Sequence, residues 1–392
     1  MLHKTITVIV IIICLCSIGC ESPSANKKLL KDSVDTKLNL AQQKYDNNYF
    51  EEADRIVSEC VIADPDNAQA HLLYGKLLFA EDKGTDAVRE LQLAVELDEE
   101  LDHGWYWLGL AEQEQGQTQQ SQFCYNKAMS LNPANVDYIL AVAETYAEQE
   151  KLEDAIKLLE EKMTTMPKEI PLKTAAADLM WRLGENERAI ELYKQVMLMR
   201  DDDSSIAESL GYCYVFSGRL SEGAEIFNKL IGQCRDEQKK KSYLQVAAFC
   251  SVNSAQYDKA VNCYNELSVE ERDNAEIWVK MGQASLGAGS ADRALMCGQR
   301  ALSLQPGDTD ATVLVGCAQY SMRDYNAAIK NFEKVSSDEK NKSISRLMTA
   351  RCYEQLGRRG EAERAYKKAL EIKPSSKLGN FLAKEKSVWN WD

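Results

Sequence analysis

Cysteine and histidine are the side chains of this sequence with the widest chemical repertoire. The chain holds twelve cysteines and three histidines, but no two cysteines form a C-x-x-C pair, and only His71 and His103 lie beyond the first twenty residues. Zinc sites need such ligands at short, regular spacings. The sequence also lacks a phosphate-binding loop, a nucleophile elbow and a glycine-rich dinucleotide turn. These absences predict a protein that is not an enzyme and that binds no metal or cofactor.

The stretch HGWYWLGL, residues 103–110, brings three aromatic rings together. Consecutive residues of a helix point about 100° apart, so Trp105, Tyr106 and Trp107 cannot all enter one core. Trp and Tyr bury large areas at a small cost in side-chain entropy, which makes a ring outside the core suited to binding another molecule. The role of each ring therefore depends on the elements that position it.

Composition indicates a folded, helix-rich chain. Glycine and proline contribute 20 and 7 of the 392 residues, and charged residues make up 28%, a balance unlike that of disordered proteins. The 61 acidic and 47 basic side chains give a formal net charge of −14. Because this charge opposes attraction to phosphates, we expect no nucleic-acid partner.

The first twenty residues form a separate segment. Lys4 precedes the run TITVIVIIICLCSIG, which is shorter than the about 20 apolar residues that span a bilayer and fits a secretory signal. Gly19 followed by Cys20 resembles the end of a bacterial lipoprotein signal, although Ser17 stands where that signal usually has Leu. The resemblance implies a lipid on Cys20 and a membrane-anchored lipoprotein of the bacterial cell envelope, on its periplasmic or outer-surface side. An inner-membrane signal anchor and ordinary cleavage are the alternatives.

A period of 34 residues organises the rest of the chain. In a frame that begins at Val34, five of the seven prolines fall at position 32, position 8 is always Gly or Ala, and position 20 is always Ala, Ser or Gly. Larger apolar residues recur at positions 4, 7, 11 and 24, a spacing that indicates amphipathic helices. Gly at position 15 of five units indicates a left-handed helix cap. Each unit is therefore predicted to be a helix, a tight turn and a second helix.

The frame divides the chain into a signal segment, a linker, ten units and a capping helix with a short tail. Two helix axes about 8 Å apart leave no space for a large side chain at their crossing, which explains the small residues at positions 8 and 20. We expect Ala155→Leu or Gly211→Leu to overpack such a crossing at a cost on the order of 1–3 kcal/mol. The predicted segments are 1–20, 21–33, then the units 34–67, 68–101, 102–135, 136–169, 170–203, 204–237, 241–274, 275–308, 309–342 and 343–376, and finally 377–392.

The pattern resembles the tetratricopeptide repeat, whose 34-residue unit carries Trp, Leu, Gly, Tyr, Ala, Phe, Ala and Pro at these positions. Residues 105–133, WYWLGLAEQEQGQTQQSQFCYNKAMSLNP, carry it clearly. The resemblance implies an all-α, right-handed superhelical solenoid of about ten helix-turn-helix units, with the first helices lining a concave groove. Gly298 stands where an aromatic residue is usual and is expected to weaken the local packing.

The resemblance also assigns the three rings. Trp105, at position 4, is expected in the core. Trp107, at position 6, is expected where one unit meets the next. Positions 5, 9, 12 and 13 resemble the groove-facing positions of the family. No Lys occurs at position 5, which argues against the family's clamp for a partner's C-terminal carboxylate. In the alternative interpretation, the rings pack on one another inside a narrow superhelix. The predicted partner-binding residues are Tyr106, Trp107, Leu110, Asp178, Trp181, Tyr212, Phe216 and Phe249.

Six cysteines recur at two positions of the frame, which indicates small, half-buried apolar sites, with disulfides as the alternative. They are Cys213, Cys250 and Cys352 at position 10, and Cys124, Cys263 and Cys297 at position 23.

These observations lead to an expected function. We expect a non-enzymatic scaffold, anchored by lipid at the cell envelope, that binds partner proteins in pilus, secretion, polysaccharide-export or outer-membrane assembly. A regulatory module that binds one peptide, and an accessory subunit of a cell-wall or glycan enzyme, are the alternatives.

Overall fold

The described part of the chain is entirely helical. The computed structural model describes residues 23–200 and 203–370, and within them twenty helices and no strand occur. This confirms the all-α fold and the stacking of consecutive helices. The signal segment with Cys20, and the capping helix expected at 377–392, lie outside the described residues.

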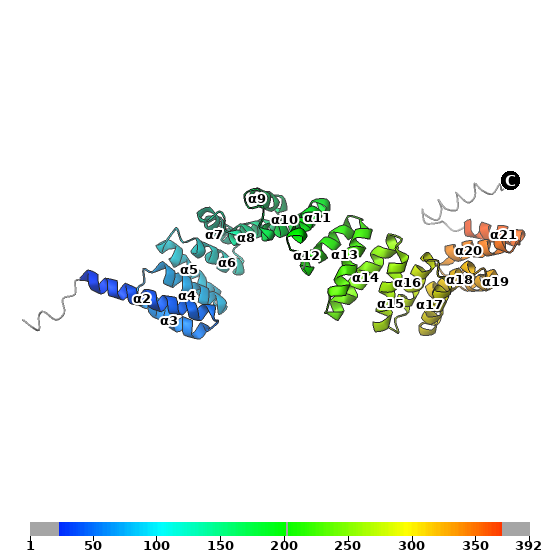
Figure 1. Cartoon of the computed structure of the whole chain (residues 1–392), viewed down its shortest axis with the longest axis horizontal. Coiled ribbons are helices and arrows are strands. Elements are labelled where there is room, and N and C mark those ends of the chain that lie inside the picture. Colours follow the sequence, from blue (N-terminus) through cyan, green and yellow to red (C-terminus); the bar gives the residue numbers. More distant parts are fainter. Residues whose placement is uncertain (1–22, 201–202, 371–392) are drawn as a thin grey trace, which may run out of the picture. The chain divides into compact units, whose positions relative to one another are not determined.

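The helices fall into two compact units, Met1–Leu183 and Gly184–Asp392, which are described separately. Within each unit, every helix packs against the next one in the chain (Figure 1). The first unit contains α2 (Pro23–Asp46), α3 (Phe50–Ala63), α4 (Ala68–Ala80), α5 (Gly84–Leu97), α6 (Asp102–Glu114), α7 (Thr118–Leu131), α8 (Val136–Glu148), α9 (Leu152–Thr165) and α10 (Ile170–Leu183).

The second unit continues the same alternation of helices and tight turns. It contains α11 (Asn186–Met199), α12 (Ser204–Phe216), α13 (Leu220–Gln233), α14 (Glu237–Asn253), α15 (Tyr257–Glu270), α16 (Ala275–Gly287), α17 (Ala291–Leu304), α18 (Thr309–Ser321), α19 (Tyr325–Lys334), α20 (Lys342–Gln355) and α21 (Arg359–Leu370).

Two helices are longer than the frame predicts. The α2 helix begins at Pro23 and includes most of the segment 21–33, which we expected to be a linker. Proline is favoured in the first turn of a helix, and no glycine or further proline interrupts the chain before Asp46. In α14, the three residues inserted at 238–240 add a turn at the start of the helix, where the side chain of Asp236 accepts a hydrogen bond from the backbone N–H of Lys239.

The turns at position 15 share one backbone conformation. The five glycines expected there have φ between +72° and +87°, as a left-handed cap requires. The other five units place an L-residue in the same region, with φ between +59° and +66°. Those residues are Asn48, Asp82, Glu150, Ala255 and Arg323.

Helix crossings explain the small residues of the frame. A Cβ atom on Gly109 would lie 2.6 Å from ring carbons of Tyr125, so the ring occupies the space of a side chain. At Gly298, where an aromatic residue is usual, a Cβ atom would lie 2.7 Å from Cγ2 of Val315, so α18 approaches this residue closely. The space over Gly282, which corresponds to the space that the Tyr125 ring fills over Gly109, is taken by the side chain of Leu314 on α18.

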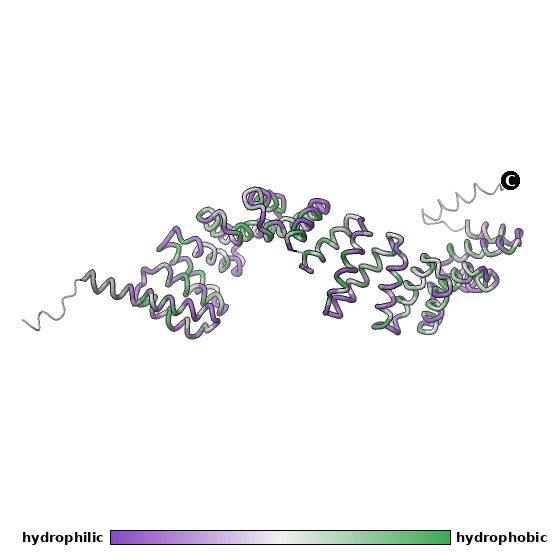
Figure 2. Tube along the Cα trace, in the orientation of Figure 1, coloured by the Kyte–Doolittle hydropathy of each residue, from purple (hydrophilic) through white to green (hydrophobic). Residues whose placement is uncertain are grey.

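Apolar residues form the contacts between helices in both units, and hydrophobic and hydrophilic residues alternate along each helix (Figure 2). The six cysteines of positions 10 and 23 are buried among them, at 4% exposure or less, and none of the nine described cysteines forms a disulfide. Burial raises the pKa of Cys124 to about 12 and that of Cys250 to about 11. No described helix is both long and apolar enough to cross a membrane.

Candidate functional site

The predicted binding residues lie on the first helices of successive helix pairs. Five of them belong to the first unit and three to the second, and the surfaces of the two units are described one at a time. We call the surface formed by α4, α6 and α8 the unit-one face, and the surface formed by α12 and α14 the unit-two face.

Tyr106 is the centre of a cluster of rings on the unit-one face. Its ring centroid lies 5.1 Å from that of Tyr138 on α8 and 5.8 Å from that of Tyr125 on α7. Tyr106 is half-buried, whereas Tyr138 and Tyr125 are buried at 1% and 0% exposure. The ring therefore packs on two core residues and also presents surface, which combines the two roles that the sequence left open.

Hydrogen bonds hold the polar ends of these rings. The Tyr125 hydroxyl donates to Oε1 of Gln113 at 2.7 Å, and Nε2 of Gln113 donates to Oε1 of Glu148 at 2.6 Å. The Tyr138 hydroxyl donates to Oδ2 of Asp102 at 3.2 Å. These bonds connect α6, α7 and α8 and fix the positions of the carboxylates at the edge of the cluster.

The unit-one face is acidic as well as aromatic. Neither α6 nor α8 contains Lys or Arg. Burial raises the pKa of the Tyr106 hydroxyl, and the nearby carboxylates of Asp137 and Glu144 raise it further. Rings beside carboxylates favour cationic side chains, through ion pairing and through cation–π contact. The carboxylates on these two helices are Asp102, Glu112, Glu114, Asp137, Glu144 and Glu148.

Trp107 lies at the contact between two helix pairs, as expected. Its ring meets Phe79 of α4 edge to face, with centroids 5.7 Å apart. The ammonium nitrogen of Lys76 lies 5.1 Å from the Trp107 ring and 4.9 Å from the ring of Tyr45, so one cation is held between two aromatic faces. Burial lowers the pKa of Lys76, while the charge of Asp46 opposes that shift.

Trp105 differs from the expectation of a core residue. Its ring packs against the core but is only half-buried, and its indole Nε1 donates to the carbonyl oxygen of Glu99 at 3.0 Å. The ring also meets Phe123 edge to face, and Phe123 is 63% exposed. A tryptophan whose N–H needs an acceptor is more easily satisfied at the edge of a core than inside it.

The other three predicted residues of the first unit are half-buried, as Tyr106 is. They are Leu110 on α6, and Asp178 and Trp181 on α10. The structure brings Leu110 onto the same helix face as Tyr106, one turn further along α6. Asp178 and Trp181 lie three residues apart on α10, outside the unit-one face.

The unit-two face combines rings with one ion pair. Nζ of Lys239 lies 2.7 Å from Oε2 of Glu208, and the Tyr243 hydroxyl donates to the same oxygen at 2.8 Å. The hydrogen bonds to Glu208 and Tyr243 raise the pKa of Lys239. Lys239 comes from the inserted turn of α14, so the insertion supplies a cation that joins α14 to α12. Tyr212 is half-buried beside them, with its ring 5.0 Å from Phe227.

Phe216 and Phe249 are the most exposed rings among the predicted residues. Phe216 ends α12 and is 66% exposed, and Phe249 on α14 is 52% exposed. Large exposed rings lose hydration when a partner covers them, so each is a candidate contact for another protein.

Sequence reasoning missed the two lysines of these surfaces. Lys76 is at position 9 and Lys239 is in the insertion, whereas the search for cations considered position 5 alone. Within residues 23–200 and 203–370, no group of three or more His, Cys, Asp and Glu side chains could hold a metal ion.

Family models match most of the repeat region. Models described as tetratricopeptide repeat match residues 38–101, 103–135 and 146–210. The model of the cilia and flagella-associated protein 70 middle TPR-like domain matches residues 243–373. No curated protein matches the chain.

Several solved structures are similar in fold. The pilF protein of Pseudomonas aeruginosa is 14% identical, with a TM-score of 0.47, over 55% of this chain and 97% of its own. A tetratricopeptide repeat protein of Parabacteroides merdae is 17% identical, with a TM-score of 0.38, over 64% of this chain and 98% of its own. YrrB, described as a TPR protein with an unusual peptide-binding site, is 14% identical, with a TM-score of 0.40, over 46% of this chain and 94% of its own.

Proposed function

We propose, from the premise that this chain is a tetratricopeptide-repeat protein, that it is a non-enzymatic scaffold that binds partner proteins through its first helices. The exposed rings of Phe216 and Phe249 carry the proposal. Both lie on the unit-two face, which the contacts of Glu208 with Lys239 and Tyr243 hold together. Aromatic anchors on a rigid helical surface are the usual centre of a protein interface.

The unit-one face supports binding of a partner with basic side chains. Tyr106 presents ring surface beside Glu144, and neither α6 nor α8 carries Lys or Arg. Lys76 of α4 lies over the ring of Trp107. An Arg or Lys of a partner would stack on a ring and pair with a carboxylate. The partner for this face is therefore a protein segment rich in Arg or Lys.

Crosslinking in native membranes tests the proposal. The parent chain should capture a specific protein that is lost from a Phe216→Ser, Phe249→Ser variant. Val269→Ser is the matched control, because Val269 is 59% exposed on α15 but lies outside both faces. If the double variant, with unchanged helicity, captures the same protein as the control, the unit-two face does not bind that partner.

We further propose that Cys20 carries lipid and anchors the chain at a bacterial cell envelope. The support is the apolar run before Gly19 and Cys20, which resembles a lipoprotein signal. A lipid on Cys20 would anchor the chain, because each buried CH₂ of an acyl chain contributes about 0.8 kcal/mol to membrane binding. Metabolic labelling with a fatty-acid analogue should modify the parent and not Cys20→Ser. Equal labelling of the parent and of Cys20→Ser would refute lipid attachment at Cys20. A parent chain that is neither cleaved nor labelled would support the signal anchor.

The identity of the captured partner protein shows which cellular process the scaffold serves. Pilus assembly, secretion, polysaccharide export and outer-membrane assembly are the processes that we propose. If a short synthetic peptide binds as the captured partner does, a regulatory module that binds one peptide is favoured instead. Capture of saccharide after protease treatment of the ligand pool would favour an accessory subunit of a cell-wall or glycan enzyme.

A further inference from the structure

A groove on the second helices of the second unit lies apart from the unit-two face. It has a volume of about 480 Å³ and is formed by α15 and α17, with α16 between them. This volume is within the range of sites that bind a ligand or a side chain of a partner. On α16 it is lined by Trp278 and Met281, at positions 4 and 7 of the frame, whereas the predicted binding residues occupy other positions on the first helices.

The lining of this groove is apolar at its centre. Met281 and Cys297 are buried at 4% and 3% exposure, and the indole Nε1 of Trp278 donates to the carbonyl oxygen of Arg272 at 3.0 Å, which fixes the ring. Met296 on α17 is 68% exposed. A flexible, polarizable methionine at an open apolar site adapts to the shape of an incoming side chain.

The charged residues that line the groove are both cations. Arg293 forms no ion pair with another described residue. Arg300 lies over the Trp278 ring at 6.0 Å, and its only ion pair among the described residues is a contact of 3.5 Å with Asp273, which is 91% exposed. No Asp or Glu lines this groove. In a chain of net charge −14, such a local excess of positive charge selects a negatively charged partner.

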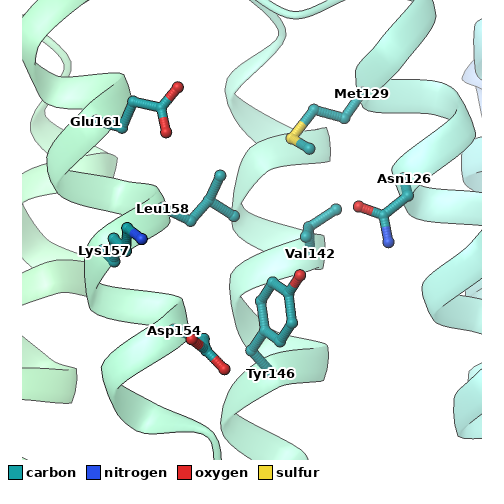
Figure 3. A pocket seen from close by; sticks show the side chains of 8 residues that line it. All are labelled: Asn126, Met129, Val142, Tyr146, Asp154, Lys157, Leu158 and Glu161. Carbon is teal, nitrogen blue, oxygen red and sulfur yellow. The ribbon is translucent and has the colours of Figure 1, made fainter.

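A second groove of the same kind serves as an internal comparison. It lies between α7 and α9 over α8, has a volume of about 290 Å³, and uses equivalent positions of the frame (Figure 3). Positions 19 and 26 carry Asp154 and Glu161 there, where the α15–α17 groove carries Arg293 and Arg300. The α7–α9 groove is smaller and also contains Lys157, but at positions 19 and 26 the two grooves carry opposite charges.

We propose that the α15–α17 groove binds an acidic segment of a partner protein that inserts an apolar side chain. The apolar side chain packs against Met296 and Trp278, and a carboxylate pairs with the guanidinium of Arg293. A scaffold with this groove and the unit-two face binds two protein segments at different surfaces of one unit.

A labelled peptide tests the proposal on the full chain. The probe carries Glu and Asp around a central Leu–Trp pair, and a matched peptide carries Lys in their place. Fluorescence anisotropy measures the affinity, and carbon-13 methyl signals of methionine locate the peptide, with the Met296 signal assigned from Met296→Leu. We expect the acidic peptide to bind, to shift the Met296 signal and to weaken about tenfold with Arg293→Glu.

Two control variants separate this groove from other sites. Lys157→Gln alters the α7–α9 groove at the frame position of Met296 and should leave the acidic peptide's affinity unchanged. Phe249→Ser alters the unit-two face and should also leave it unchanged, so this proposal can fail while the proposed function stands. Equal binding of acidic and basic peptides, an unshifted Met296 signal, or an unchanged affinity of Arg293→Glu would each overturn it.

Discussion

The left-handed turns at position 15 provide a prediction that separates backbone strain from side-chain contacts. Ala255 adopts φ +59°, and Gly218 adopts φ +77° at the equivalent position of the preceding pair of helices. A Cβ atom added at Gly218 would meet no heavy atom within 4 Å. Exchanging Gly and Ala at these two turns therefore changes the backbone preference and almost nothing else.

The magnitude follows from two opposing terms. An L-residue in the left-handed region costs about 1–2 kcal/mol, and glycine costs about 0.4–1 kcal/mol because it loses more conformational entropy on folding. We expect Ala255→Gly to stabilise its turn by about 0.5–1 kcal/mol and Gly218→Ala to destabilise it by a similar amount. Gly232 lies in α13 at negative φ with open space around it, so Gly232→Ala should stabilise the helix by about 0.5–1 kcal/mol.

Hydrogen exchange measured by mass spectrometry is the appropriate assay, because stability in a repeat protein is local. Amides of α14 and α15 should exchange more slowly in Ala255→Gly, and amides of α12 and α13 should exchange faster in Gly218→Ala. Urea unfolding followed by circular dichroism gives the overall effect. If Ala255→Gly loses as much stability as an ordinary Ala→Gly change in a helix, the assignment of the left-handed turn is refuted.

Three further predictions concern the core. Gly211→Leu should lower the free energy of unfolding by about 1–3 kcal/mol in urea titrations, because even a Cβ atom there would lie 3.0 Å from the Phe227 ring; an unchanged midpoint would contradict the crossing. Gly298→Ala should also destabilise, by about 1–3 kcal/mol, because its Cβ atom would meet Val315 at 2.7 Å, whereas a stabilised variant would show that the site has space. In the native chain, iodoacetamide should label Cys234, which is partly exposed, before the buried cysteines of positions 10 and 23; uniform labelling measured for each cysteine by mass spectrometry would contradict their burial.

Much of the fold could be predicted because the frame repeats a local physical constraint. A small residue at position 8 means that a neighbour such as Tyr125 fills the crossing, and this signal recurs in every unit. Five of the turns were identified from glycine. The turns at Glu150 and Arg323 carry no such signal, because L-residues disfavour positive φ and only the register of the frame reveals the conformation.

The candidate site was less predictable, because contacts between repeats depend on side-chain direction. The frame identified Tyr106 as a surface position but did not show that Tyr138 packs on its ring. Lys76 was missed because its long side chain reaches rings on two other helices. Trp105 was expected in the core because an apolar period does not record the hydrogen-bond requirement of an indole.

Site-specific photocrosslinking tests the central claim, binding of a protein through the first helices, most directly. A photoreactive amino acid replaces Phe249 in one variant and Val269 in another, two residues of similar exposure, 52% and 59%, in the same unit. The account predicts that one defined protein crosslinks from position 249 and not from position 269. A partner that crosslinks from position 269 alone, or equally from both, would contradict the claim that the first helices form the binding surface.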